Sequence, residues 1–190
     1  FILFLASLTG CSGNPTPEKK LISSIEFEDA YIAECVKNSA SSQNATFVHE
    51  LKRLDCTGER FSGDDFGPRG YAHSTKGLEA FTALEVLSLD GNWLSALDFS
   101  KFPQLSKVSI GYNLFQNLDF SKNSQLESLD VSCNPISKLV LPTSGKLQQL
   151  QANLALYAGR PVCGHIPPAE VTTNLMDVNT NLPLTDQSYL

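Results

Sequence analysis

The side chains that most often carry catalysis or metal binding are scattered through this sequence. Its three histidines are His49, His73 and His165, and no metal-ligand spacing relates them to one another. The sequence also lacks the G-x-S-x-G motif of hydrolases, the phosphate-binding glycine loop and the H-E-x-x-H zinc motif. We therefore expect a protein that is not an enzyme, uses no cofactor and holds no metal ion.

Two adjacent carboxylates, Asp64 and Asp65, lie within residues 62–71, which are rich in glycine and other loop-forming residues. A dedicated calcium loop places its acidic ligands at alternating positions, which this pair does not do. We interpret the segment as a solvated loop, with calcium binding as the less favoured alternative.

The first of the five cysteines ends an apolar segment. Residues 1–8 are too few to cross a bilayer as a helix, which needs about 20 residues, but their length suits the hydrophobic part of an export signal. The following Leu8-Thr9-Gly10-Cys11 resembles a bacterial lipobox. That resemblance implies that Cys11 carries a lipid and becomes the mature N-terminus, and Ser12 is compatible with sorting to an outer membrane.

The overall charge argues against one class of partner. The chain has a net charge of −6 and a pI near 5.0, with 18% charged and 42% hydrophobic residues. Nucleic acids and anionic membrane surfaces are bound by clustered lysine and arginine. We therefore expect no nucleic-acid binding, and the apolar content is sufficient for a folded core.

A repeat of 21 residues dominates the middle of the chain. Leucines mark it at equal intervals, at Leu84, Leu105, Leu126 and Leu147. Each block follows the pattern L-x-x-L-x-L-x-x-N-x-L. The first three blocks supply Leu84, Leu87, Leu89, Asn92 and Leu94, then Leu105, Val108, Ile110, Asn113 and Phe115, then Leu126, Leu129, Val131, Asn134 and Ile136.

This spacing predicts the local structure of each block. Leu87 and Leu89 alternate with Ser88, so a short strand there buries both leucines and exposes the serine. Asn92 lies where the strand turns away, and its amide can bond to backbone groups of the turn and of the neighbouring coil. Since no single coil can bury its apolar face alone, the coils must stack into a parallel sheet with strands about 4.8 Å apart.

These blocks resemble the leucine-rich-repeat family, and their second halves resemble its bacterial 21-residue variant. The second halves contain Leu97-Asp98-Phe99-Ser100, Leu118-Asp119-Phe120-Ser121 and Leu139-Val140-Leu141. The resemblance implies a second short extended segment on the far side of each coil rather than a helix, which alternation along these segments also favours. The expected fold is mainly β: a short leucine-rich-repeat solenoid of about four to five coils with an N-terminal α-helical cap.

The cap is expected from residues 25–36, whose apolar positions have helical spacing. An amphipathic helix there would cover the open end of the first coil, which we place at residues 51–61 with Glu59 in the asparagine position. Cys35, on the buried face of that helix, would then lie near Cys56, which faces inward in the first coil.

A disulfide between Cys35 and Cys56 would close about 21 residues and contribute about 3 kcal/mol in the chain-entropy model. Export permits such a bond. We favour this pairing among the three connectivities that four non-anchor cysteines allow. The pairing of Cys133 with Cys163 stays open, because Cys133 occupies an outward-type position at the exit of its strand.

These observations divide the chain into five segments. They are a lipoprotein signal peptide and lipobox at 1–11, a flexible tether at 12–24, a helical cap at 25–50, the solenoid at 51–165, and an irregular C-terminal segment at 166–190.

The exposed side of the predicted sheet is the candidate binding surface, since repeat solenoids use such faces for partners. Its residues alternate with the inward leucines and are polar, with tyrosine and tryptophan near the edge, which suits contact hot spots. The residues that we expect to bind are Glu85, Asp90, Trp93, Lys107, Tyr112, Glu127 and Asp130. Exposed strand residues are polar whether or not they bind, so this assignment needs a test.

The sequence therefore favours a lipid-anchored, non-catalytic interaction module of the bacterial cell envelope. We expect a monomer, anchored at the outer membrane on its periplasmic or outer side, that binds a protein or a glycan. The alternative is a structural envelope scaffold without a dedicated ligand.

Overall fold

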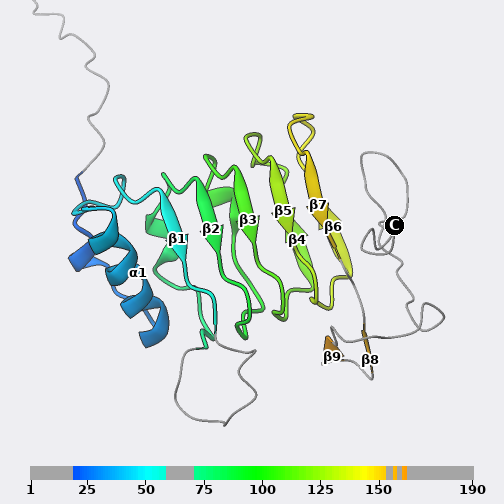
Figure 1. Ribbon diagram of the computed structural model, residues 1–190, viewed down its shortest axis with the longest axis horizontal. Coiled ribbons are helices and arrows are strands. Elements are labelled where there is room, and N and C mark those ends of the chain that lie inside the picture. The colour runs from blue at the N-terminus through cyan, green and yellow to red at the C-terminus, as the bar shows by residue number, and fades with distance from the viewer. Residues whose placement is uncertain (1–18, 59–70, 153–155, 158–159, 162–190) are drawn as a thin grey trace, which may run out of the picture.

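The computed structural model describes residues 19–58, 71–152, 156–157 and 160–161. Five parallel strands form one sheet, in the order β1-β2-β3-β5-β7, and they lie side by side along the length of the solenoid in Figure 1. Their bounds are β1 Arg53–Asp55, β2 Val86–Ser88, β3 Lys107–Ser109, β5 Ser128–Asp130 and β7 Gln149–Gln151. The expected signal segment and lipobox with Cys11, the expected loop with Asp64 and Asp65, Cys163, His165 and the whole C-terminal segment at 166–190 lie outside the described residues.

The repeat fixes the register of this sheet. Leu87 of β2 pairs with Val108 of β3, which pairs with Leu129 of β5 and then Leu150 of β7, each one repeat further on. The turn from β1 to β2 is longer, with Leu54 opposite Leu87. The expected mainly β solenoid with a helix near the N-terminus is confirmed.

The return side of the coils is more varied than the sequence predicts. In the later coils, β4 (Asn117–Asp119) pairs in parallel with β6 (Lys138–Val140), as the extended second half requires. In the earlier coils the equivalent residues 75–77 and 96–98 form no strand, and a short 3-10 helix begins directly after each of them, η2 (Leu78–Ala80) and η3 (Phe99–Lys101). One reason is Gly77, which lies one repeat before Asp98. The φ of Gly77 is 102°, and a strand that could pair with the second half of the next coil cannot adopt this value.

Three further short elements complete the described chain. They are the 3-10 helix η1 (Ile22–Ser24) and the antiparallel pair β8 (Leu156–Tyr157) and β9 (Arg160–Pro161).

The core runs along the solenoid between the sheet and the return segments. The inward strand residues Leu87, Val108 and Leu129 are each at most 3% exposed. Phenylalanines fill the return side, where the rings of Phe99 and Phe120 have centroids 4.5 Å apart. Every coil thus buries its apolar residues against the next one, which a single coil could not do.

A ladder of buried asparagines joins the coils at the turn after each strand. Asn92, Asn113 and Asn134 are completely buried. The Nδ2 of Asn113 donates to the carbonyl oxygens of Ile110 and Gly111 in its own coil and to Leu89 O in the coil before, 2.8 Å away. Each side-chain oxygen accepts an N–H of the preceding coil, at Ala72, Leu94 and Phe115 respectively.

The helix α1 (Ala30–Ser42) lies beside the outer edge of β1 (Figure 1). Asp29 caps its N-terminus by accepting the N–H groups of Tyr31 and Ile32 at 2.9 and 3.1 Å. The buried residues Ile32, Val36 and Ala40 recur every fourth position, so one face of the helix packs on the first coil.

The predicted disulfide between Cys35 and Cys56 is present and links α1 to the first coil, with the two Cα atoms 5.6 Å apart. Cys133 is also disulfide-bonded and is 2% exposed, and the Cys163 that we considered as its partner lies outside the described residues.

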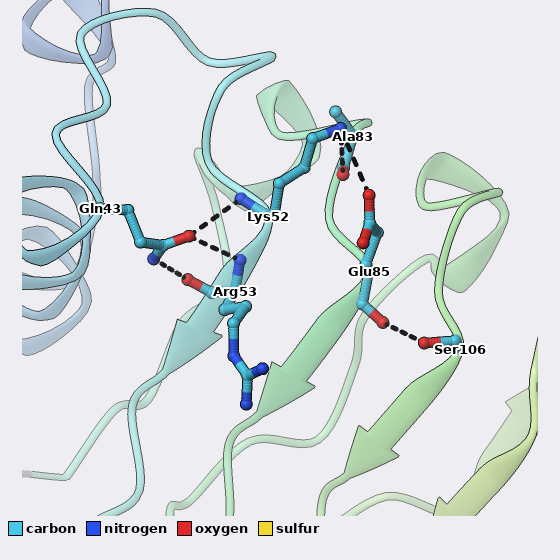
Figure 2. A network of polar contacts seen from close by, with 6 residues as sticks. All are labelled: Gln43, Lys52, Arg53, Ala83, Glu85 and Ser106. Atoms are coloured by element: carbon cyan, nitrogen blue, oxygen red, sulfur yellow. Dashed lines mark hydrogen bonds and ion pairs between the residues drawn. The ribbon is translucent and has the colours of Figure 1, made fainter.

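Side chains of the helical cap satisfy the free edge of β1, as Figure 2 shows for Gln43. Its Oε1 accepts the N–H groups of Lys52 and Arg53 at 3.2 and 3.1 Å, and its Nε2 donates to Arg53 O at 2.6 Å. The hydroxyl of Tyr31 donates to Thr57 O at 2.6 Å further along the same edge. One glutamine amide thus replaces the neighbouring strand that β1 lacks on this side, which protects an edge that could otherwise pair with another chain.

Replacement of Gln43 by methionine should destabilise the fold by about 1–2 kcal/mol, because two backbone N–H groups and one carbonyl lose their partners while the side-chain volume is kept. Urea unfolding followed by circular dichroism measures this loss. The control is Gln104→Met, at an exposed glutamine for which the structure shows no side-chain hydrogen bond. Equal stability of the two variants would contradict the role of Gln43 at this edge.

Candidate interaction surface

The exposed face of the five-stranded sheet, which we call the sheet face, carries side chains in three rows that cross the strands. The first row is Arg53, Val86, Lys107, Ser128 and Gln149, and the second is Asp55, Ser88, Ser109, Asp130 and Gln151. The third row, at the strand exits, is Thr57, Asp90, Gly111 and Ser132. Parallel pairing one repeat apart aligns equivalent positions of every coil, so each row follows from the repeat length.

Small side chains in these rows leave a hollow of about 290 Å³ on the sheet face. Its lining comes from four strands and comprises Val86, Leu87, Ser88, Lys107, Val108, Ser109, Ser128, Leu129, Asp130, Gln149 and Gln151. Three serines line it, and a hydroxymethyl group is too short to fill the space between longer neighbours. A ligand here would meet hydroxyl, amide and charged groups above an apolar floor.

A larger hollow of about 660 Å³ lies away from the sheet face, between the return segments of neighbouring coils. It is lined by Thr75, Ser95, Ala96, Leu97, Asp98, Leu114, Gln116 and Asn117. Asp98 is the single charged residue of its lining and already accepts hydrogen bonds from Ser100. We favour the smaller hollow as the candidate site, because it lies on the sheet face and four strands contribute side chains to it, including the charged Lys107 and Asp130.

Hydrogen bonds link the second and third rows from the first coil to the third. The Asp55 carboxylate accepts the Thr57 hydroxyl at 2.8 Å, and Thr57 Oγ1 lies 2.9 Å from Ser88 Oγ. The carboxylate of Asp90 then accepts from Ser88 Oγ at 3.0 Å and from the Gly111 N–H at 2.6 Å. These bonds hold Asp90 in one position among neutral donors.

The electrostatic state of Asp90 differs from that of an exposed carboxylate. Burial raises the pKa of Asp90, and the nearby Asp130 carboxylate adds to the rise, while hydrogen bonds from Ser109, Ser88 and Gly111 oppose it. By contrast, hydrogen bonds from Ser121 lower the pKa of Asp119, which is exposed on the return side. The charged form of Asp90 is therefore held at a cost that its surroundings offset only partly.

Three of the seven residues that the sequence predicts for binding lie in the rows of the sheet face, and a fourth, Glu85, lies just before the first row. Lys107, Asp130 and Asp90 belong to the first, second and third rows respectively. Glu85 directly precedes β2 and forms an ion pair with Lys52, with 3.5 Å between Nζ and Oε1 (Figure 2).

The other three predicted residues lie at the margins of the sheet face. Glu127 is exposed directly before β5. Tyr112 is in the turn after β3 with a φ of 55°, and its N–H donates to Ser132 O. Trp93, which is 42% exposed, follows the buried Asn92 and so belongs to the turn rather than to a row. The structure thus gathers Asp90, Lys107 and Asp130 and leaves the two aromatic residues apart.

Sequence reasoning missed two residues of this surface. Gly111 occupies the third row between Asp90 and Ser132, and Val86 is the apolar member of the first row. Alignment of the 21-residue blocks in columns would have identified both positions, but a pattern read only for polar residues passes over them.

Within the described ranges, no group of three or more His, Cys, Asp or Glu side chains is arranged to hold a metal ion. The same part of the chain contains no helix that is long and apolar enough to span a membrane.

Replacement of Asp90 by asparagine should change how stability depends on pH. Because the pKa of Asp90 is raised in the folded state, its ionisation on going from acid to neutral pH lowers the free energy of unfolding. The Asp90→Asn variant should therefore gain stability relative to wild type as the pH rises from about 3 to about 7.

The control for this measurement is Asp119→Asn, because the pKa of Asp119 is lowered rather than raised in the folded state. It should lose stability relative to wild type over the same pH range. Thermal melts at several pH values measure both variants, and parallel stability curves for wild type and Asp90→Asn would show that Asp90 has an ordinary pKa.

Comparison with known proteins agrees with this geometry. A family model described as "Leucine Rich Repeat" matches residues 125–147. A search of curated proteins found no match. Among solved structures, the chain is similar to one described as "Functional domain of InlJ from Listeria monocytogenes includes a cysteine ladder", with 21% sequence identity and a TM-score of 0.56. The similarity covers 70% of this chain and 28% of that one, so this chain spans little more than a quarter of its length.

That description names a cysteine ladder, whereas the buried ladder of the present chain is built from asparagines. One fold assignment follows from three findings: the 21-residue register of the parallel sheet, the matched repeat model and the similar solved fold. The described part of this chain has the leucine-rich-repeat fold, a parallel-strand solenoid with a helix near its N-terminus, and residues 125–147 match the repeat model.

Proposed function

We propose that this chain is a non-catalytic interaction module of the bacterial cell envelope that binds a protein partner through its sheet face. The observation that carries the proposal is the hollow over β2, β3, β5 and β7, whose walls are polar side chains repeated in register. Leucine-rich-repeat folds typically present such surfaces to proteins. The binding residues in the proposal are Asp90, Lys107 and Asp130, with Glu85 and Glu127 at the margin.

The proposal includes the route by which the module reaches its partner. The apolar N-terminal segment and the Leu8-Thr9-Gly10-Cys11 sequence support export and a lipid anchor at Cys11. The disulfide between Cys35 and Cys56 supports an oxidising compartment outside the cytoplasm. In this proposal the solenoid is a monomer held near the outer membrane, where it meets its partner.

Site-specific photo-cross-linking in living cells tests which side of the solenoid binds. A benzophenone amino acid replaces Lys107 on the sheet face in one strain and the exposed Lys122 on the return side in another. Because the partner should cover the first row, we expect a discrete high-mass adduct from position 107 and little or none from position 122. The readout is the mobility of the tagged chain on a denaturing gel after illumination.

Equal adducts from both positions would contradict a dedicated binding face and favour the structural scaffold. Absence of any adduct from position 107, in a strain where the protein is correctly exported, would likewise contradict binding through this face.

A further inference from the structure

The larger hollow, of about 660 Å³, lies among the return segments, which run behind the five-stranded sheet in Figure 1. Its lining comes from three successive coils, in which Thr75, Ala96 and Asn117 occupy equivalent positions 21 residues apart. The middle coil has only the small side chains of Ser95 and Ala96 where the next coil has Gln116 and Asn117. Two small residues beside two long ones therefore account for a space of the size that is usual for small-molecule sites, about 300–1,000 Å³.

The edge of β4 that borders this hollow carries backbone groups without a partner among the described residues. β4 pairs with β6 on its other side, where Gln116 O accepts the Lys138 N–H at 3.1 Å. Because successive residues of a strand direct their backbone groups to alternate sides, the N–H and C=O of Asn117 point away from β6. Within the described part of the chain, no hydrogen bond joins residues 116–119 to residues 95–98 of the coil before. This edge therefore offers a free donor and a free acceptor to a ligand.

The same edge is closed to a further strand. A strand that paired with β4 would lie about 4.8 Å from it, and the return segment 95–98 already occupies that place in the stack of coils. Leu97 of this segment packs against the core beside its equivalent, Leu118, which is 2% exposed. Insertion of a peptide strand would pull Leu97 away from the core, so a compact ligand that lies over the gap suits the hollow better.

The side chains of the lining add polar groups that can both donate and accept. Within the described ranges, the amide of Gln116 and the hydroxyl of Ser95 make no hydrogen bond, and Asn117 accepts one long bond of 3.4 Å from Ser137. A hydroxyl group donates and accepts as an amide does. A ligand with several hydroxyl groups can therefore satisfy all of these partners, whereas a ligand with acceptors alone leaves the acceptors of the hollow unpaired.

The charge of the lining excludes anions. It contains no basic side chain, and its one carboxylate, Asp98, accepts hydrogen bonds from Ser100 at 2.6 and 3.1 Å and lies 3.7 Å from Lys101 Nζ. A phosphate or carboxylate ligand would thus find no counter-charge. Leu97 and Leu114 are partly exposed in the lining and provide an apolar surface for the C–H groups of a ring.

We propose that this hollow is a second binding site of the protein and that it takes a neutral sugar. Hydroxyl groups of the sugar pair with the backbone of Asn117 and the amide of Gln116, and its C–H face lies on Leu97 and Leu114. The site lies on the side of the coils away from the sheet face. The inference goes beyond the proposed function and does not depend on it, because a protein on the sheet face would leave this hollow open.

Nuclear magnetic resonance of the full chain, labelled with ¹⁵N and held in dodecylphosphocholine, a detergent without a sugar headgroup, tests the proposal. The probes are the neutral trisaccharides maltotriose, cellotriose and triacetylchitotriose, each titrated separately. The side-chain NH₂ resonances of Gln116 and Asn117 are the reporters, and that of the exposed Gln104, before β3, is the internal control. We expect at least one trisaccharide to shift both reporters in a saturable manner and to leave Gln104 unmoved.

Matched variants make the test specific, with binding followed at Asn117. Gln116→Ala removes an amide that both donates and accepts and should weaken the trisaccharide at least about fivefold. Its control, Gln104→Ala, makes the same change at an exposed glutamine outside the lining and should leave the affinity unchanged. Ala96→Leu fills the hollow without removing a polar side chain and should weaken the sugar as well. Because Ala96 is exposed, the fold accommodates this change.

Absence of a saturable shift with all three trisaccharides, or equal affinity in Gln116→Ala and Gln104→Ala, would overturn the proposal. The end-capped peptide Ala-Ala-Ala tests the other ligand class. If this peptide shifted the reporters and the sugars did not, the hollow would be a peptide site and the proposal would be wrong. Failure here is separate from failure of the proposed function, since adducts from position 107 report on the sheet face alone.

Discussion

Buried side-chain amides connect each coil of this solenoid to the one before it, and the placement of every other group follows from that connection. The turn after each strand buries backbone groups that water cannot reach, and Asn92, Asn113 and Asn134 supply both donors and an acceptor to them. An apolar residue of similar size would fill the space but leave those groups unpaired, at a cost of about 1–3 kcal/mol for each one. The amides therefore fix both the turn and the distance to the neighbouring coil, and the strands fall into a register of one repeat.

That register explains why a surface with defined chemistry exists at all. Strands of three residues present few side chains each, but alignment across five strands produces continuous rows. Within those rows the size of a single residue has a local effect: serines border the hollow, and Gly111 allows a close approach of its backbone to Asp90, since a Cβ there would lie 3.1 Å from Asp90 Oδ1. The helix α1 preserves the arrangement at its N-terminal end, because Gln43, Tyr31 and the Cys35 disulfide occupy the edge where a further coil would stack.

Much of this structure was predictable, because the repeat encodes it locally. The inward positions, the buried asparagines and the pairing of Cys35 with Cys56 follow from alternation and spacing, and the structure has them, although Ile136 and Leu147 are only partly buried. The return side was less predictable, since the second half of the Leu-Asp-Phe-Ser segment begins the 3-10 helix η3 in one coil, whereas the first half of the same segment lies in β4 in the next. On that side the local structure depends on the neighbouring coil, in which Gly77 lies one repeat before Asp98, the residue that caps η3. The place of Gly111 beside Asp90 was missed because glycine has no side chain, and a search for polar residues passes over it.

The account depends most directly on the energetic role of the asparagine ladder, and denaturant unfolding of Asn113→Ala measures it. The control is Asn117→Ala, at an exposed asparagine four residues further on. If the ladder sets the stacking of the coils, Asn113→Ala should lose at least about 3 kcal/mol of unfolding free energy. The loss arises because four backbone groups lose a partner, namely the carbonyls of Leu89, Ile110 and Gly111 and the N–H of Leu94. The stability of the control should change little. A variant at Asn113 as stable as the control would contradict the account, and the register of the sheet face would then need another explanation.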